Sequence, residues 1–476
     1  MKKMKVAVLV HNDVRKDSRV RKGVRTLVEN GVQVHLFGIG EPGESDERLE
    51  GEYEFTLVRK LKSSGAAMGK GLSVRLQVIA VACLVAPLIL GVKLLEWLVS
   101  PSWLTSPAIS LSGLIQIMLL SGFILFVALK AGVLRRILEL GFKASSLLFT
   151  TSIKRAIARS IFARKLVAVV EESEADYDCI WCHDLIALKA GRTLKRRNPS
   201  LRLVWDAHEI YEDVAYSPRL QSFLFRYLIW RSQKHIDAFI TISESFADFY
   251  KKYKHLPEAK LVMNATRFER VPVKTDQLRI AAGLNEDRKI MIFQGGFSVK
   301  RGIGMLMDSI PDLPEPWSVV FMGWGALEQE MTDRANSINQ GKESGDRKMV
   351  IIPPVPNKEL PMWTGGADLG IIPYENSGMN HLYCTPNKLW EFPNAGVPFI
   401  ATDLVEIGKM VREWKTGFLI QRDFTAEDIV RAVSERTDEE LEKVRENCLV
   451  FSRSRSWSNF EPNILAAVGI DKVPAS

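Results

Sequence analysis

Short runs rich in valine and isoleucine recur along the chain and alternate with segments of helical periodicity. The runs of the first half are KVAVLV, QVHLFGI, DCIWC, RLVWD and AFITIS, and those of the second half are KIMIFQ, SVVFMG, KMVIIPP, DLGIIPY and VPFIATD. Such runs are typical of strands buried in a parallel sheet, where a helix crosses from each strand to the next. The pattern predicts the α/β class, with two Rossmann-like domains that face each other across a cleft.

The length of the chain agrees with two domains, since 476 residues are more than one hydrophobic core usually holds. We expect a first domain over residues 1–275 and a second over residues 276–455. Residues 456–476 are expected to form a C-terminal helix and tail that return to the first domain.

One stretch of the first domain, between Leu76 and Leu129, departs from this alternation. It contains the apolar run LQVIAVACLVAPLILGV and then, from Trp97 to Leu129, a run without any charged residue. The second run is long enough for a helix that spans the hydrocarbon of a bilayer, which needs about 20 residues. We expect a hydrophobic helical hairpin inserted in the first domain. Buried core helices of a large soluble domain are the alternative interpretation.

Basic residues flank this apolar stretch on both sides, in a chain whose net charge is +8. An excess of Lys and Arg beside both ends predicts that both ends lie on the cytoplasmic side of a membrane. The hairpin and the basic amphipathic segment after it, together residues 70–165, are predicted to contact anionic membrane lipids. The same clustering argues against nucleic acid as the partner, and no motif for binding RNA or DNA occurs.

The sequence CIWCH has the Cys-x-x-Cys-His spacing that is used to attach a c-type haem. Haem attachment of this type needs export, whereas five cysteines in distant segments and an N-terminus without a cleavage site indicate a reducing compartment. In the alternative interpretation Cys179 and Cys182 are strand residues, and His183 projects from the strand end into a site. A hydrogen-bonded histidine at the domain edge is a third possibility.

Polar and glycine residues follow several of the predicted strands. His183 follows CIWC, His208 and Glu209 follow RLVW, and Gly295 and Gly296 follow IMIFQ. Ligands of open parallel sheets bind outside the carboxyl ends of the strands. These side chains and turns are therefore expected to border the cleft.

The first predicted helix lies in DSRVRKGVRTLVENG, with Asp17 or Ser18 as its N-cap and Asn30 and Gly31 at its end. Arg15 and Arg19 belong to the loop and helix that begin at the same sheet edge as His183. We expect them to bind an anionic acceptor headgroup, although most charge runs are only solvated helix faces.

The segment CTPNKLWEFPNAG predicts a helix with Thr385 as N-cap and Pro386 in the first helical position. Lys388 would then stand in the first turn, where a cation is unfavourable unless an anion binds there. Glu391, one turn further, shares its face and can accept hydrogen bonds from a pair of sugar hydroxyls. The alternative is a solvated helix that tolerates a lysine.

The segment FQGGFSVKRGIG places Lys300 and Arg301 directly after a glycine turn. Glycine allows the backbone to approach a ligand closely, and the planar guanidinium of Arg suits phosphate oxygens. Together with Lys388, this segment predicts a diphosphate clamp. Asp176 and Asp178 have the spacing of a metal-binding pair, but they precede a strand, so we expect a turn and no metal site.

These segments resemble the retaining, nucleotide-sugar-dependent glycosyltransferases of the GT-B fold that form family 4. The resemblance covers the chain except the apolar insert, and it is strongest in GADLGIIPYENSGMNHLYCTPNKLWEFPNAGVPFIATD. It implies that the second domain binds the nucleotide sugar and the first binds the acceptor. Two positions depart from the family: Tyr383 stands where the first of two glutamates is usual, and Gly296 stands where an arginine is usual.

The resemblance implies roles for individual residues. Arg301, with Lys300 near it, would hold the donor diphosphate, Glu391 the ribose, and His183 would lie beside the reacting sugar. The donor site predicted here consists of Gly295, Gly296, Thr385, Asn387, Lys388 and Glu391, and the acceptor site consists of Arg15, Arg19, His208 and Glu209.

The expected activity is transfer of a sugar, with retention, from a nucleoside diphosphate sugar to a lipid-linked acceptor of the polyprenyl diphosphate type. The reaction would take place at the cytoplasmic membrane face, in glycan or polysaccharide biosynthesis, without a cofactor or metal. UDP is favoured over GDP on family frequency. A nucleotide-sugar epimerase of the same fold and an inactive membrane-tethered sugar-nucleotide-binding subunit are the alternatives.

Overall fold

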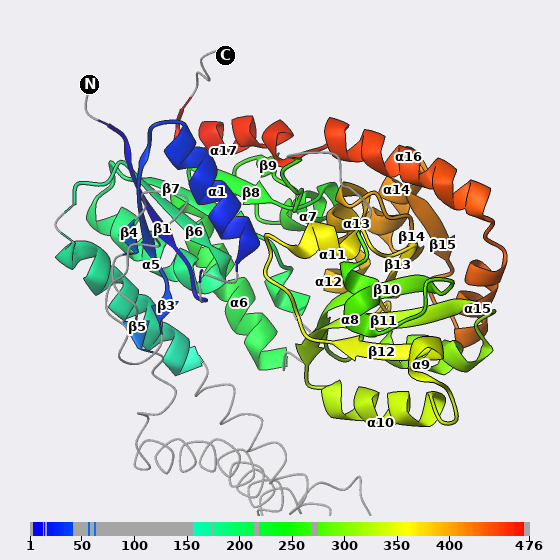
Figure 1. The fold of residues 1–476 in the computed structure, drawn as a ribbon. Helices are drawn as coiled ribbons and strands as arrows, with labels where there is room; N and C mark the ends of the chain where they lie inside the picture. The colour runs from blue at the N-terminus through cyan, green and yellow to red at the C-terminus, as the bar shows by residue number, and fades with distance from the viewer. Residues whose placement is uncertain are drawn as a thin grey trace, which may run out of the picture.

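A computed structural model describes residues 3–12, 14, 17–40, 56–57, 61–62, 156–173, 175–213, 219–268 and 275–470. This part of the chain forms two α/β halves that lie side by side (Figure 1). The predicted hairpin lies outside the described residues, as does most of the basic segment after it, of which residues 156–172 are described and are helical. Within the described ranges, no helix combines the length and apolar character that crossing a membrane requires.

The N-terminal half contains a seven-stranded parallel sheet in the order β4-β2-β1-β6-β7-β8-β9. All five strands predicted for this half are present, because each is a run of side chains that the sheet buries. The sequence did not predict the short strands β4 and β9. The strands are β1 (Lys5–Leu9), β2 (Gln33–Phe37), β4 (Thr56–Leu57), β6 (Cys179–His183), β7 (Arg202–Ala207), β8 (Ala238–Thr241) and β9 (Ala259–Leu261); β3 (Ile39–Gly40) and β5 (Leu61–Lys62) form a separate pair.

The C-terminal half contains a six-stranded parallel sheet in the order β12-β11-β10-β13-β14-β15. Its five predicted strands are also confirmed, so the prediction of two Rossmann-like sheets in the α/β class is correct. The strands are β10 (Lys289–Phe297), β11 (Trp317–Gly325), β12 (Met349–Ile352), β13 (Leu369–Ile372), β14 (Phe399–Thr402) and β15 (Gly417–Ile420), of which β15 was not predicted.

The first helix, α1 (Ser18–Glu29), begins and ends as its sequence predicts. Asp17 is the N-cap and accepts hydrogen bonds from the backbone N–H groups of Arg19 and Val20, and Asn30 is the C-cap. The other helices of the N-terminal half are α5 (Asp184–Arg197), α6 (Arg219–Ser232) and α7 (Glu244–Tyr250). Those of the C-terminal half are α8 (Gln277–Ala282), α9 (Ile303–Ser309), α10 (Glu328–Ile338), α11 (Leu360–Thr364), α12 (Met379–Leu382), α13 (Lys388–Asn394), α14 (Val405–Trp414), α15 (Ala426–Ser434) and α16 (Asp438–Ser454).

The last described helix, α17 (Glu461–Val468), packs against the N-terminal half although it follows the C-terminal half in sequence (Figure 1). Trp457, just before it, donates a hydrogen bond from Nε1 to Oγ1 of Thr26 on α1 at 2.9 Å. Asn463 donates from Nδ2 to the carbonyl of Leu261 on β9 at 2.8 Å. The chain therefore crosses between its halves twice, and this limits how they move relative to each other.

Close packing of α1 on the sheet makes Gly23 sensitive to substitution. A Cβ added at Gly23 would lie 2.6 Å from Cη2 of the buried Trp181 on β6. Gly23→Ala should therefore lower the free energy of unfolding by about 1–3 kcal/mol, the usual cost of overpacking. In the control Gly304→Ala, the new Cβ meets open space on helix α9, and stability should rise by about 0.5–1 kcal/mol. Denaturant unfolding measures both, and equal stability of Gly23→Ala and the unsubstituted protein would contradict this packing.

Candidate functional site

A cleft of about 990 Å³ opens between the two halves, at the carboxyl ends of both sheets. Nine of the predicted site residues line it. Those from the N-terminal half are His208 and Glu209, and those from the C-terminal half are Gly295, Gly296, Arg301, Thr385, Asn387, Lys388 and Glu391. The rule that ligands bind beyond the strand ends thus predicted from sequence which residues line this cleft.

The glycine loop after β10 brings the backbone close to the cations of the cleft. Gly295 has a φ of +110°, and a Cβ added there would lie 3.0 Å from Nζ of Lys388. Gly302 has a φ of +68°, and its added Cβ would lie 1.8 Å from the carbonyl oxygen of Pro373. Only glycine fits at Gly302, so the loop is held tightly against the end of β13. This contact fixes the backbone beside Arg301.

Two cations, Lys388 and Arg301, face the cleft. Lys388 is only 5% exposed, and Nζ donates a hydrogen bond to the hydroxyl of Tyr374 at 3.3 Å. The guanidinium of Arg301 lies 5.5 Å from the centre of the Tyr374 ring. Over the described ranges, no carboxylate forms an ion pair with Lys388 or Arg301. A buried charge without a partner is costly, so this corner of the cleft suits an anion.

The start of helix α13 differs from the prediction. Thr385 was expected as N-cap, but the helix begins at Lys388, and Asn387 precedes it without a capping hydrogen bond. The reason is that residues 386–389 form a separate turn, in which the N–H of Leu389 donates to the carbonyl of Pro386 at 3.0 Å. A helix of seven residues has a weak dipole, so the side-chain charge of Lys388 remains as the argument for an anion.

A chain of hydrogen bonds fixes the carboxylate of Glu391. Its Oε2 accepts from Nε2 of Gln294 at 2.8 Å, and Oε1 of Gln294 accepts from Oγ1 of Thr364 at 2.8 Å. All three residues line the cleft. Gln294 and Thr364 were not among the predicted site residues, although Gln294 is the polar residue that ends the predicted strand KIMIFQ. The remaining carboxylate oxygen of Glu391 is therefore presented in a defined orientation.

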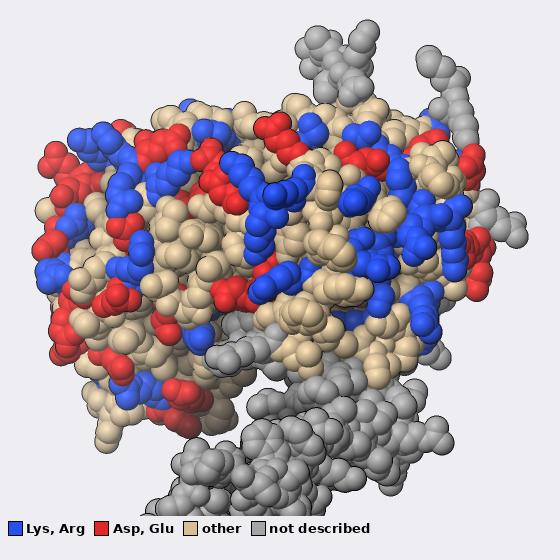
Figure 2. Space-filling model, turned by 180° about the vertical axis from the view of Figure 1, so that it is seen from behind, with Lys and Arg blue, Asp and Glu red and all other residues tan. Residues whose placement is uncertain are grey.

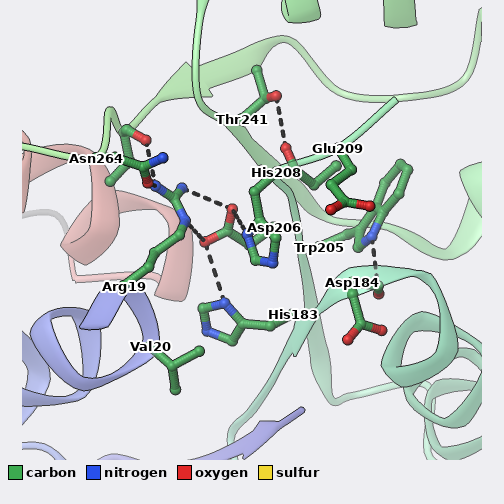
Figure 3. A network of polar contacts seen from close by, with 12 residues as sticks. Arg19, Val20, His183, Asp184, Trp205, Asp206, His208, Glu209, Thr241 and Asn264 are labelled. Carbon is green, nitrogen blue, oxygen red and sulfur yellow. Dashed lines mark hydrogen bonds and ion pairs between the residues drawn. The ribbon is translucent and has the colours of Figure 1, made fainter. Parts of the chain in front are cut away.

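His183 lies beneath the cleft surface. It is 1% exposed, and its ring stacks on that of His208 with centroids 5.8 Å apart. Nδ1 of His183 lies 3.5 Å from Oδ2 of Asp206, and Nδ1 of His208 lies 3.5 Å from Oδ1 of the same carboxylate (Figure 3). His208 itself borders the cleft. The two imidazole rings are thus stacked, and both lie beside the carboxylate of Asp206.

Arg19 lies deeper than predicted and does not line the cleft. Its guanidinium donates to both carboxylate oxygens of Asp206, at 2.8 and 3.2 Å, and to the carbonyl of Val262 at 2.7 Å (Figure 3). Arg19 therefore joins α1 to strand β7 and to the residue that follows β9. Lys300, which precedes Arg301 with a φ of +68°, is also absent from the cleft lining, and Arg15 lies outside the described residues.

The charges of this buried cluster follow from its geometry. Burial lowers the pKa of His183 to about 4, so the ring is neutral near pH 7. Burial alone would raise the pKa of Asp206, but Arg19 and the two histidines hold it well below its usual range. Asp206 is consequently an anion that compensates Arg19 and orients both rings.

The backbone after His183 is held in an uncommon conformation. Asp184 has a φ of +65°, and its Oδ1 accepts hydrogen bonds from the N–H groups of Ile186 and Ala187 at 2.9 and 3.3 Å. Non-glycine residues adopt this conformation at a cost and are enriched at functional sites. The side chain of Asp184 caps α5 and so fixes the end of β6, from which His183 projects.

The cluster also has the composition of a metal site. His183, Asp206 and His208 have ligand atoms that all lie within 4.8 Å of one another. A cation placed between them would meet the guanidinium that already binds both oxygens of Asp206, which argues against it. Asp178, from the sequence DYD, lies at the amino end of the sheet, where its Oδ2 accepts a hydrogen bond from the N–H of Lys5 at 2.8 Å.

Tyr383 contacts the N-terminal half and belongs to an apolar cluster with Ile210, Ile242 and Phe246. Its carbonyl oxygen lies 3.4 Å from Oγ of Ser243, which donates to it. The position at which the family's first glutamate was expected therefore serves an apolar contact between the halves. A glutamate in its place would lose this apolar contact between the halves.

Comparisons with known proteins follow the division of the chain into two halves. Residues 288–438 match the family model described as Glycosyl transferases group 1, and residues 138–263 match that described as Glycosyltransferase Family 4. TuaH of Bacillus subtilis (strain 168), named as a teichuronic acid biosynthesis glycosyltransferase, is 26% identical over 191 residues. The match covers 38% of this chain and 44% of TuaH, which is less than half of that protein.

Solved structures show the same fold at low identity. Sucrose-phosphate synthase from Thermosynechococcus elongatus is 12% identical, with a TM-score of 0.63 and coverage of 96% of both chains. HepE of Anabaena in complex with UDP and glucose is 11% identical, with a TM-score of 0.61, covering 98% of this chain and 99% of that one. These matches show the two-domain GT-B fold.

The buried state of His183 predicts a pH dependence of stability. The unfolded chain binds a proton near pH 6.5, whereas the folded protein does so only near pH 4. The free energy of unfolding should therefore fall as the pH is lowered through this window, because the unfolded state binds more protons there. In denaturant unfolding, His183→Asn should lose less of its free energy of unfolding on acidification than the unsubstituted protein. The exposed control His255→Asn should lose the same amount as the unsubstituted protein. An identical pH dependence in His183→Asn would show that the ring does not titrate as its burial implies.

Proposed function

We propose, from the premise that this chain is a glycosyltransferase of group 1/family 4, that it transfers a sugar from a nucleoside diphosphate sugar to a lipid-linked acceptor. The single observation that carries the proposal is the pair of cations, Lys388 and Arg301, which lie beside a glycine backbone and form no ion pair with a carboxylate of the described residues. A diphosphate supplies the anion that this corner of the cleft lacks.

The chemical difficulty of the transfer is the negative charge that develops on the departing diphosphate. Preorganised positive groups stabilise such charge without rearranging during the reaction. Lys388 and Arg301 are held by Tyr374 and by the loop that Gly302 anchors. We assign them to the donor phosphates in place of a metal ion.

Glu391 is assigned to the ribose of the donor. A carboxylate accepts two hydrogen bonds from neighbouring hydroxyls, and Gln294 leaves one of its oxygens for this purpose. UDP remains our first choice of nucleotide. Its support is limited to the resemblance and to HepE of Anabaena, whose structure is described with UDP and with UDP-glucose.

The acceptor is assigned to the side of the cleft formed by His208 and Glu209. His183 lies beneath the surface, and its ring is neutral near pH 7, so it does not serve as an imidazolium acid. It is assigned to positioning the reacting sugar through His208. In the proposed reaction the configuration is retained, and the leaving phosphate takes the proton of the attacking hydroxyl.

Membrane association at the cytoplasmic face is part of the proposal. Its support is the apolar sequence between Leu76 and Leu129 and the basic residues on both sides of it. The name of TuaH, which refers to teichuronic acid, supports a place in polysaccharide biosynthesis for the present chain. A polyprenyl diphosphate carrier would present its sugar at this surface.

Binding of the nucleotide tests the role of Glu391. Glu391→Ala should weaken UDP binding about 10- to 100-fold, since hydrogen bonds to charged groups contribute about 1.5–3 kcal/mol. Calorimetry on the detergent-solubilised protein measures this, with the exposed Glu439→Ala as the matched control. Unchanged affinity of Glu391→Ala would remove Glu391 from the donor site.

Deleting residues 76–129 tests the membrane assignment. The shortened protein should appear in the soluble fraction while UDP binding is kept, because the cleft is built from other residues. The intact protein should sediment with membranes in a lysate prepared without detergent. An intact protein that remains fully soluble there would contradict the assignment.

Product analysis separates the proposed activity from its alternatives. An epimerase would convert its nucleotide sugar in the absence of an acceptor, whereas a transferase should label the lipid fraction of membranes given radiolabelled nucleotide sugars. An inactive binding subunit would do neither. Transfer that disappears in Arg301→Ala and persists in the exposed control Arg422→Ala would exclude the inactive subunit.

A further inference from the structure

Helix α6 exposes an aromatic face that the candidate site does not use. Four aromatic side chains are strongly exposed in the described ranges, and three of them, Phe223, Tyr227 and Trp230, lie on α6. Phe223 and Trp230 are 60% and 58% exposed. The spacing of four and three residues puts all three on one side of the helix, while Gln221 and Ile229 on the other side are buried.

Two arginines extend this face into a continuous ridge. Arg226 and Arg231 are exposed and occupy the same side of the helix. The rings of Tyr227 and Trp230 stack with centroids 6.0 Å apart, and the guanidinium of Arg231 lies 5.9 Å from the Tyr227 ring. Trp and Tyr with adjacent Arg are the side chains favoured at the headgroup level of a bilayer.

The surroundings of the ridge are basic. Helix α5 carries Lys189, Arg192, Lys195 and Arg196, and the pKa of Arg192 is lowered first by its burial and then by the nearby Arg231. Acidic partners offset part of this charge, as Glu212 does for Arg226 at 3.2 Å. Figure 2 shows Lys and Arg side chains gathered over the half of the molecule that contains the N-terminal sheet.

The ridge adjoins the described end of the basic segment. The guanidinium of Arg159, on the helical segment 156–172, lies 4.8 Å from the ring of Phe225 on α6. Arg164 and Lys165 are exposed on the same segment. Two stretches far apart in sequence therefore contribute positive charge to one surface.

We propose that the exposed side of α6, defined by Phe223, Arg226, Tyr227, Trp230 and Arg231, docks into the headgroup region of an anionic membrane. The aromatic rings enter the interface, and the arginines, with those of α5 and segment 156–172, bind lipid phosphates. This contact uses only described residues and is independent of the apolar stretch between residues 76 and 129.

Docking there would also orient the cleft. The residues before α6, Tyr211–Asp213, form a short helix whose Asp213 accepts hydrogen bonds from the N–H groups of Met379 and Asn380 in the C-terminal half. Glu209, just before it, lines the cleft. A membrane bound to α6 would therefore lie close to the acceptor side.

A fluorescent label at the ridge tests the proposal on the full-length chain. Cys83 and Cys384 are replaced by Ser, Trp230→Cys is labelled with an environment-sensitive dye, and the protein is reconstituted in lipid nanodiscs. The emission should shift to the blue in discs that contain phosphatidylglycerol, relative to discs of phosphatidylcholine alone. The shift should disappear in Arg226→Gln/Arg231→Gln. The control Val450→Cys, exposed on α16, should show no shift.

Three results would overturn the proposal. Emission that is equally blue in both discs would mean that the chain itself covers the ridge, and emission that follows protein concentration would mean that a second copy covers it. Emission typical of water in both discs would mean that the ridge contacts nothing. Tyr227→Cys repeats the test should Trp230→Cys not fold. Donor binding does not enter the readout, so failure here leaves the proposed function unaffected.

Discussion

The arrangement of the cleft depends on two positive charges, those of Lys388 and Arg301, with which no carboxylate of the described residues forms an ion pair. Lys388 is buried and donates a hydrogen bond to the hydroxyl of Tyr374, and the guanidinium of Arg301 lies beside the ring of the same tyrosine. Two other buried cations of the described residues are compensated, Arg19 by Asp206 and Arg288 by Glu315. The contrast indicates that Lys388 and Arg301 are placed to bind an external anion, whereas the ion pair of Arg19 and Asp206 makes the acceptor side rigid.

The two halves of the site differ in how they are held. On the donor side, Gly302 and the chain from Thr364 through Gln294 to Glu391 fix the groups that would meet a nucleotide. On the acceptor side, the imidazole pair shares one carboxylate. Helix α17 and the contacts of the segment before α13 hold both sides together, which preserves the width of the cleft.

The strands and the residues that border the cleft could be predicted from the sequence, because buried β-branched runs and the residues after them are local signals. Prediction from the sequence failed where contacts between distant segments decide. Arg19 was expected in the cleft, but Asp206 is 187 residues away and binds it. One local prediction was also wrong, since Thr385 was expected to cap α13 but the turn over residues 386–389 intervenes. Gln294 meets Glu391, and Thr364 meets Gln294, only in the folded chain, where residues distant in sequence come together.

The most direct measurement of the central claim compares the affinities of UDP and uridine for the full-length protein and for Lys388→Met, which removes the charge at similar volume. UDP should bind the unsubstituted protein about 100-fold more tightly than uridine, as two charge-assisted phosphate contacts would give. Most of that advantage should be lost in Lys388→Met, while uridine binding stays the same. Equal affinities of UDP and uridine for the unsubstituted protein would show that the cations of the cleft serve another purpose.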